Sequence, residues 1–228
     1  MRARRTSAFT LLELMVVITI IVVLAGVLVV GISSAFGRAG EHETKTMIDT
    51  LSAGVGRFET RYRFYPPSSI SRLSTFFGAA PPEFDPNETN MGIEAVVMAL
   101  RTRRNGGPFL DNALLAQRTS NTDSDEVITN FTNVEGEIKL FEIRDYWENP
   151  LVYVNLDDLN PARNPNAAGS IYIVGKNGGQ QAIQLAELNT ALIDSETGVV
   201  RAKGYAIWSF GPDGINDYGN GDDIASWQ

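Results

Sequence analysis

The chain has 228 residues, a formal net charge of −8 and an isoelectric point near 4.7. The acidic balance argues against nucleic acid as a partner, because a phosphate-binding face needs an excess of Lys and Arg. The chain has no cysteine, which excludes disulfides, cysteine-ligated metal centres and a cysteine nucleophile. It has one histidine, which argues against a histidine-rich metal site or a Ser-His-Asp triad. Since no nucleotide-binding or nucleophile motif is present either, an enzyme is not predicted.

The first distinctive feature is an apolar segment near the N-terminus, because residues 14–37 carry no charge. As a helix this segment would be about 36 Å long, enough to cross a hydrocarbon core of about 30 Å. Arg2, Arg4 and Arg5 precede it. By the positive-inside rule these arginines keep the N-terminus in the cytoplasm, so the rest of the chain is expected on the other side of the membrane.

Three interpretations of this segment are open. A cleavable secretory signal is disfavoured by the length of the apolar segment, and Ser33-Ser34-Ala35 is the nearest cluster of small residues. A plain signal anchor leaves Glu13 unexplained. A carboxylate costs about 2.5–3.5 kcal/mol at the bilayer centre and less near the interface, so a charge at this position usually has a partner. The third interpretation is therefore a segment in which Glu13 has a function.

Residues 5–13, Arg-Thr-Ser-Ala-Phe-Thr-Leu-Leu-Glu, carry this third interpretation, because they resemble the processing site of type IV prepilins and pseudopilins. The resemblance implies cleavage between Ala8 and Phe9 by a prepilin peptidase, which also methylates the new Phe9 amine. It also implies that Glu13 aids assembly by pairing with the terminal amine of a neighbouring subunit. Most members of the family have Gly before the cut, where this chain has Ala8, so cleavage is expected to be slower.

The helical period continues beyond the apolar segment. Apolar residues recur at spacings of three and four, which predicts an amphipathic helix; they are Met47, Ile48, Leu51, Val55, Phe58 and Tyr62. Pro66 and Pro67 end the pattern, because proline removes a backbone donor and restricts the residue before it. The simplest prediction is one helix over residues 9–63, with a hydrophobic half at 9–37 and an amphipathic half within 38–65.

The remaining residues, 66–228, predict one globular domain of the α+β class. Residues 66–90 are rich in turn-forming types and predict a loop, residues 92–100 predict a short helix, and residues 119–136 predict a long turn or a short hairpin. Residues 180–193 predict a further short helix. Expected strands, bounded by turn residues, are 138–143, 151–155, 170–174 and 204–210. Their short connections favour a small antiparallel sheet packed on the long helix.

Two groups of carboxylates lie in the middle of the chain, at residues 123–126 and 135–142. They contain enough acids for an acid/base pair. We interpret them instead as a solvated polar face, which is the commoner role of such runs.

The C-terminal part is acidic and has no Lys or Arg after residue 204. Four Asp, two Asn and four Gly lie within residues 211–223. Carboxylates brought together repel one another unless they are protonated or bridged by a cation. Oxygen ligands and glycine turns suit Ca²⁺, although the spacing is not that of an EF-hand. From composition alone, a calcium site and a solvated acidic loop are both open.

A second resemblance concerns this acidic part. Residues 209–214, Ser-Phe-Gly-Pro-Asp-Gly, and the later Asp-Asp-Ile at 222–224 are similar to the C-terminus of the major pseudopilin, the G subunit, of type II secretion systems. Residues 145–153, Asp-Tyr-Trp-Glu-Asn-Pro-Leu-Val-Tyr, and residues 61–67 resemble two other segments of that family. The resemblance implies a calcium ion bound by the loop. By position, its ligands are the carbonyl of Phe210 and the carboxylates of Asp213, Asp222 and Asp223.

Taken together, the resemblances imply a pilin-like fold with a leader peptide at residues 1–8 and a calcium loop in the periplasmic domain. The implied function is a structural pseudopilin of the inner membrane, which polymerises through its N-terminal helices into the pseudopilus of a type II secretion system. Its implied partners are further copies of the chain, minor pseudopilins and the inner-membrane secretion platform. The alternatives are a type IV pilin, major or minor, and a signal-anchored periplasmic binding domain that does not polymerise.

Overall fold

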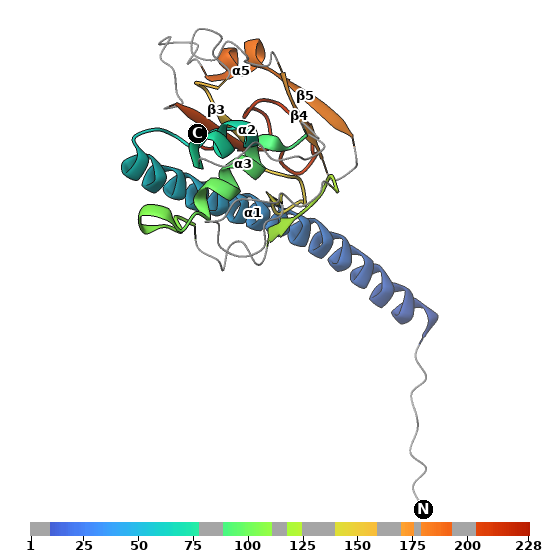
Figure 1. The fold of residues 1–228 in the computed structure, drawn as a ribbon. Coiled ribbons are helices and arrows are strands. Elements are labelled where there is room, and N and C mark those ends of the chain that lie inside the picture. Colours follow the sequence, from blue (N-terminus) through green and yellow to red (C-terminus); the bar gives the residue numbers. More distant parts are fainter. Residues whose placement is uncertain are drawn as a thin grey trace, which may run out of the picture. The chain divides into compact units, whose positions relative to one another are not determined.

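The computed structural model forms two compact units, Met1–Gly40 and Glu41–Gln228 (Figure 1). The residues that it describes are 10–77, 89–110, 118–124, 140–158, 170–175, 179–192 and 204–228. The side chains of some of these residues are not described, namely those of 29–35, 71, 74, 75, 77, 170, 171, 184, 185 and 189.

The longest element is α1, a single helix from Leu11 to Tyr62 that contributes residues to both units. This agrees with the helix expected over 9–63. The helix ends where Arg63 adopts a left-handed conformation with φ of 66°, and the Arg63 N–H donates to the carbonyl of Glu59. The prolines at 66 and 67 then keep the chain from continuing the helix.

The second half of α1 buries the predicted apolar stripe in the core of the globular unit. Met47 is 4% exposed, and the next four members of the stripe, Ile48, Leu51, Val55 and Phe58, are fully buried. The stripe packs into one hydrophobic cluster with α3, Met91–Leu100, which is buried along nearly its whole length. The short helix expected over 92–100 is thereby confirmed.

The central sheet has three antiparallel strands in the order β3, β6, β7, with bounds Val152–Asn155, Tyr205–Ser209 and Ile224–Ala225. Val152 pairs with Trp208, and Asn155 pairs with Tyr205. The strands expected at 151–155 and 204–210 are confirmed, and the antiparallel sheet makes the fold α+β as predicted. Helix α3 lies directly on β3, because a Cβ on Gly92 would overlap the carbonyl oxygen of Tyr153.

Two smaller antiparallel pairs complete the described sheet structure. Strand β4, Ser170–Val174, pairs with β5, Gln180–Gln184, and is followed by α5, Leu185–Leu192. The expected strand at 170–174 is therefore correct, whereas the expected helix at 180–193 is wrong in its first five residues, because these pair with β4.

The other pair is formed by β1, Thr119–Ser120, and β2, Glu142–Ile143. Strand β2 is all that the structure shows of the strand expected at 138–143, whose first two residues lie outside the described part. Residues 125–136 of the expected turn or hairpin lie outside it too.

Helix α2, Ile70–Phe77, lies where a loop was expected over 66–90. Ile70 and Leu73 are buried, which explains why this short segment is helical in spite of its loop-like composition. The buried carboxylate of Asp158 holds the approach to α2: its Oδ2 accepts from the backbone N–H and the hydroxyl of Ser68, and its Oδ1 forms an ion pair with Arg72.

Candidate functional site

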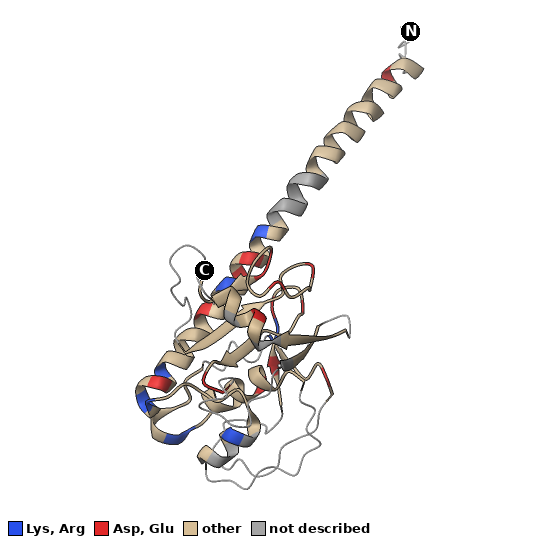
Figure 2. Ribbon diagram, turned by 90° about the horizontal axis from the view of Figure 1, so that it is seen from above, with Lys and Arg blue, Asp and Glu red and all other residues tan. Residues whose placement is uncertain are grey.

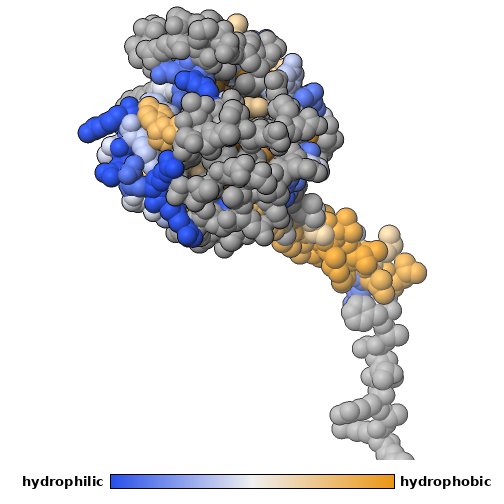
Figure 3. All heavy atoms as spheres, in the orientation of Figure 1, coloured by the Kyte–Doolittle hydropathy of each residue, from blue (hydrophilic) through white to orange (hydrophobic). Residues whose placement is uncertain are grey.

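The N-terminal half of α1 presents an apolar surface that no described part of the chain covers. The segment Leu11–Leu28 is long and apolar enough to cross a membrane, by length and composition alone, and none of it is buried. Its large side chains are between 47% and 79% exposed, and they form the orange surface of the helix in Figure 3. An apolar surface of this size needs lipid or other protein chains as its environment.

Glu13 lies in the first turn of this helix and is engaged with Thr10. The Glu13 Oε2 accepts from the backbone N–H and from the hydroxyl of Thr10, both at 3.0 Å, and the Glu13 N–H donates to the Thr10 hydroxyl at 3.2 Å. This reciprocal arrangement is a capping box, which satisfies donors at the start of a helix. The sequence interpretation missed Thr10, although the spacing Thr-x-x-Glu before an apolar run is the signal of such a box. Ala8 and Phe9 lie outside the described residues.

The second candidate site is the C-terminal loop that joins β6 to β7. A buried network holds its first residues: the hydroxyl of Ser209 donates to Asp145 at 2.6 Å and accepts from the N–H of Gly211 at 3.0 Å. The Asn149 side chain donates to the carbonyl of Gly211 at 3.1 Å. Burial raises the pKa of Asp145, although its hydrogen bonds from Ser209 and Asn149 act in the opposite direction. Residues 145–149 therefore support the start of the loop.

Asp223 is the carboxylate at the centre of this loop. It is 4% exposed, and its Oδ2 accepts from the backbone N–H groups of Asp217 at 2.9 Å and Gly219 at 2.8 Å. Its Oδ1 is buried and has no hydrogen-bond partner among the residues that the structure describes. Burial raises the pKa of Asp223 to about 7, and the charges of Asp217 and Asp222 add to the effect. A buried oxygen without a donor, beside two further carboxylates, is an arrangement that a cation would satisfy.

The structure brings the four predicted ligands to one loop but not to one point. The carbonyl of Phe210 accepts from the N–H of Gly214 at 3.2 Å. Asp213 lies beside Asp222, whose Oδ2 is 3.4 Å from the Asp213 backbone nitrogen, and a Cβ on Gly211 would overlap the carbonyl of Asp222. Among the described residues, no three carboxylates of this loop place oxygens within 4.8 Å of one another.

Asp217, which the sequence interpretation left out of the ligand set, is the carboxylate that the fold places near Asp223. Its charge raises the pKa of Asp223, its N–H donates to Asp223, and its Oδ2 lies 2.7 Å from the position of a Cβ on Gly221. The donor set is made of hard oxygens and suits Ca²⁺ better than a softer metal.

The raised pKa of Asp223 predicts how the stability of the calcium-free protein depends on pH. The folded state holds this proton up to about pH 7, whereas an unfolded aspartate releases it near pH 4. The contribution of the protonated Asp223 to the free energy of unfolding is therefore complete below pH 4. It is lost as the pH rises to 7, at about 1.4 kcal/mol per pH unit. The measurement is denaturant unfolding with chelator present at several pH values. The free energy of unfolding of the wild type minus that of Asp223→Asn gives the slope that is due to this carboxylate. A difference that does not change between pH 4 and pH 7 would contradict it.

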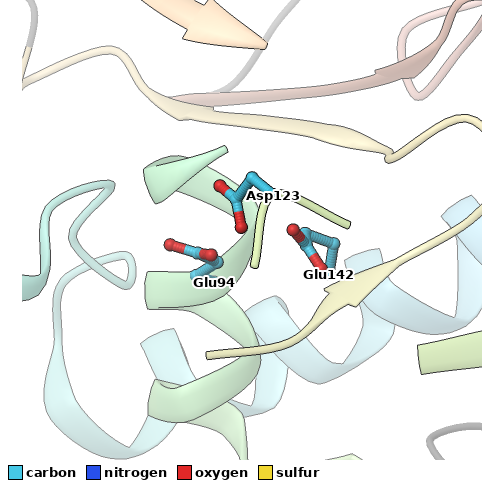
Figure 4. A group of neighbouring side chains, drawn as sticks. All are labelled: Glu94, Asp123 and Glu142. Carbon is cyan, nitrogen blue, oxygen red and sulfur yellow. The ribbon is translucent and has the colours of Figure 1, made fainter. Parts of the chain in front are cut away.

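A third group of acids, Glu94, Asp123 and Glu142, lies on α3, after β1 and on β2 (Figure 4). One oxygen of each falls within 4.8 Å of the other two. Glu142 is fully buried and accepts from the Thr122 N–H and hydroxyl and from the Asn90 amide. Burial raises the pKa of Glu142, and the charge of Asp123 raises it further.

The predicted solvated face is therefore wrong for Glu142, whose environment is the protein interior. Asn90 carries the same network further, because its Oδ1 accepts from the N–H of Val174 on β4 at 3.1 Å. Glu142 and Asn90 together thus join β2, the start of α3 and β4.

Comparison with known proteins adds one finding. Residues 3–29 match the prokaryotic N-terminal methylation motif, and the match covers the N-terminal part of the chain only. No curated protein and no solved structure matches the chain. The motif indicates a type IV pilin-like protein, and proteins of this kind are structural subunits that are processed by a prepilin peptidase and assemble into pilus-like fibres. The apolar helix Leu11–Leu28 fits the membrane anchor that is typical of the motif.

Proposed function

We propose that the chain is a structural pseudopilin that polymerises into the periplasmic pseudopilus of a type II secretion system. The observation that carries this proposal is the methylation motif at residues 3–29 at the head of a helix whose apolar surface is bare. Such a surface is suited first to lipid and then, in the assembled fibre, to the same helix of other copies. The contribution of the protein is assembly rather than a chemical reaction.

The processing that we propose follows from the basic leader. Arg2, Arg4 and Arg5 hold the N-terminus in the cytoplasm, and the globular unit lies in the periplasm, beyond the inner membrane. The peptidase then cuts between Ala8 and Phe9 and methylates the Phe9 amine. In the assembled fibre, the amine of one subunit pairs with Glu13 of another, because a carboxylate in apolar surroundings is tolerated when it is paired.

The choice of a secretion pseudopilus rests on the C-terminal loop and its support. Residues 145–149 hold the start of the loop through Asn149 and Asp145. The segment 145–153, which resembles a segment of the major pseudopilin, therefore has a structural role. The proposed partners are other copies of the chain, minor pseudopilins and the inner-membrane secretion platform.

We include a calcium ion in the proposal. Asp222 and Asp223 would hold it, with Asp213 and the carbonyl of Phe210 as the ligands that the resemblance implies, and Asp217 as an adjacent carboxylate. The bound ion would supply positive charge and oxygen coordination that hold the two ends of the loop together. The chain's own contribution is the buried Oδ1 of Asp223, which accepts no hydrogen bond from the described part of the chain.

Mass spectrometry of the N-terminus, on full-length protein isolated from membranes, tests the proposed processing. We expect a chain that begins with N-methylated Phe9, with a larger uncut fraction than in an Ala8→Gly control, because glycine is the residue that the family usually has there. A mature chain that retains residues 1–8 would contradict the proposal and favour a permanently anchored protein.

A further inference from the structure

The outward face of α1 in the globular unit carries charges of both signs on opposite flanks. Exposed residues recur there at spacings of three and four, as expected for one face of a helix; they are His42, Thr46, Asp49, Ala53, Arg57 and Thr60. The side chains between the charges are small, so a second helix can approach this face closely.

The flanks separate when the helix is projected at about 100° per residue. Glu41 and Glu59 fall on one flank, with Asp49 between it and the middle of the face. Arg57 and Arg61 fall on the other flank, as does Glu43, whose charge is paired with that of Arg118. We call these the acidic flank (Glu41, Asp49, Glu59) and the basic flank (Arg57, Arg61). Figure 2 shows both blue and red bands along the part of α1 that belongs to the globular unit.

The charges of both flanks are available to a partner. Glu41, Asp49, Arg57 and Arg61 are exposed, Glu59 is half-buried, and none of the five forms an ion pair with a residue that the structure describes. Asp49 and Arg57 are eight residues apart, or about 12 Å along the axis, which is too far for a direct pair. Lys45, on the acidic side, is half-buried and donates to the carbonyl of Ala225 at 2.8 Å.

The basic flank also carries an unfavourable arrangement. Arg57 and Arg61 are four residues apart, and like charges at this spacing destabilise a helix. An acidic partner removes this repulsion. A flank of one sign that faces the flank of the opposite sign on an identical chain makes a heterologous contact, and contacts of this kind build an open filament wherever the rotation between copies does not close a ring.

We propose that the acidic flank of one copy docks against the basic flank of a second copy of this chain, with the two α1 helices parallel. This inference rests on the proposed function and specifies the contact between subunits outside the apolar helices. Flanks of like sign repel and flanks of opposite sign attract, so the charges on the second half of α1 determine which sides of two neighbouring subunits are in contact.

Charge reversal tests the contact in the full-length chain. We expect Arg57→Glu/Arg61→Glu and Asp49→Arg/Glu59→Arg each to reduce the amount of pelleted polymer by about tenfold, since each gives the two flanks net charges of the same sign. A chain with all four substitutions restores the polymer. The two double variants, inactive separately, copolymerise when they are expressed together. Arg103→Glu/Arg104→Glu, an equal charge change at exposed arginines outside α1, is the matched control and polymerises normally.

Each outcome bears on one of the two proposals. Normal polymer from both double variants, or no recovery in the fourfold variant, overturns the flank contact and leaves the proposed function standing. Absence of polymer in the wild type and in the control overturns both. Because the chain has no native cysteine, disulfide cross-linking of a Thr50→Cys/Ser52→Cys chain, which places one cysteine on each flank and keeps all five charges, gives a second readout. We expect a ladder of cross-linked copies, and monomers alone in intact polymer would contradict the contact.

Discussion

Replacing Glu13 by valine is expected to leave membrane insertion intact and to abolish polymer formation. Insertion should not suffer, because valine is more favourable in the bilayer than a carboxylate. Assembly should fail, because the substitution leaves the terminal amine of a neighbouring subunit in apolar surroundings without its partner. Removing one member of a buried ion pair costs about 3–5 kcal/mol, and the loss recurs at every subunit contact. Membrane fractionation measures insertion, and electron microscopy of sheared fibres measures assembly.

The capping box makes a sharper control available. Glutamine at position 13 can still accept from Thr10, because glutamine also serves in a capping box, but it carries no charge. We expect Glu13→Gln to fail in assembly as Glu13→Val does. If Glu13→Gln assembles normally while Glu13→Val does not, the side chain serves to start the helix, and the proposed charge pairing is wrong.

The second large effect concerns calcium. We expect the wild type to melt at a higher temperature in calcium than in chelator. Binding at a hundred times the dissociation constant adds about 2.7 kcal/mol, or about 5–10 °C for a domain of this size. The variant Asp222→Ala/Asp223→Ala should melt at the same temperature with and without calcium, and no higher in calcium than the wild type does in chelator. Tryptophan fluorescence is a suitable measurement, because Trp208 and Trp227 are in edge-to-face contact beside the loop.

Two further variants separate charge from packing. Asp223→Asn preserves the shape of the side chain and should lose the calcium response without the loss of packing expected for alanine. Glu187→Ala, at an exposed position on α5, is a matched control that should retain the full response. A wild type that melts at one temperature with and without calcium would refute the site.

How far the sequence predicts this fold depends on whether the signal is local. The long helix was predictable because its apolar stripe repeats over many turns and ends at two prolines. Strand β5 was not, since Gln180–Gln184 becomes a strand only through its pairing with β4. Helix α2 was missed because burial of Ile70 and Leu73 depends on residues distant in the sequence.

The same distinction applies to the candidate sites. Glu13 was identified because a carboxylate before an apolar segment is conspicuous, and Thr10 could have been, because a capping box is a local pattern. The acidic composition of residues 211–223 was visible as well. The buried Oδ1 of Asp223 was not, because it depends on how the loop folds back on the N–H groups of Asp217 and Gly219.

The position of β6 determines the order in which the protein can fold. This strand is the middle one of the central sheet, and it comes from the last 25 residues of the chain. Ile207 from β6 lies in the same core as Met47 from α1, and Lys45 bonds to a carbonyl 180 residues away. The core therefore cannot form completely until residues 205–225 have been synthesised. A protein dominated by such distant contacts folds slowly. The apolar stripe of α1 stays exposed to solvent until β6 and β7 have been synthesised and have packed against it.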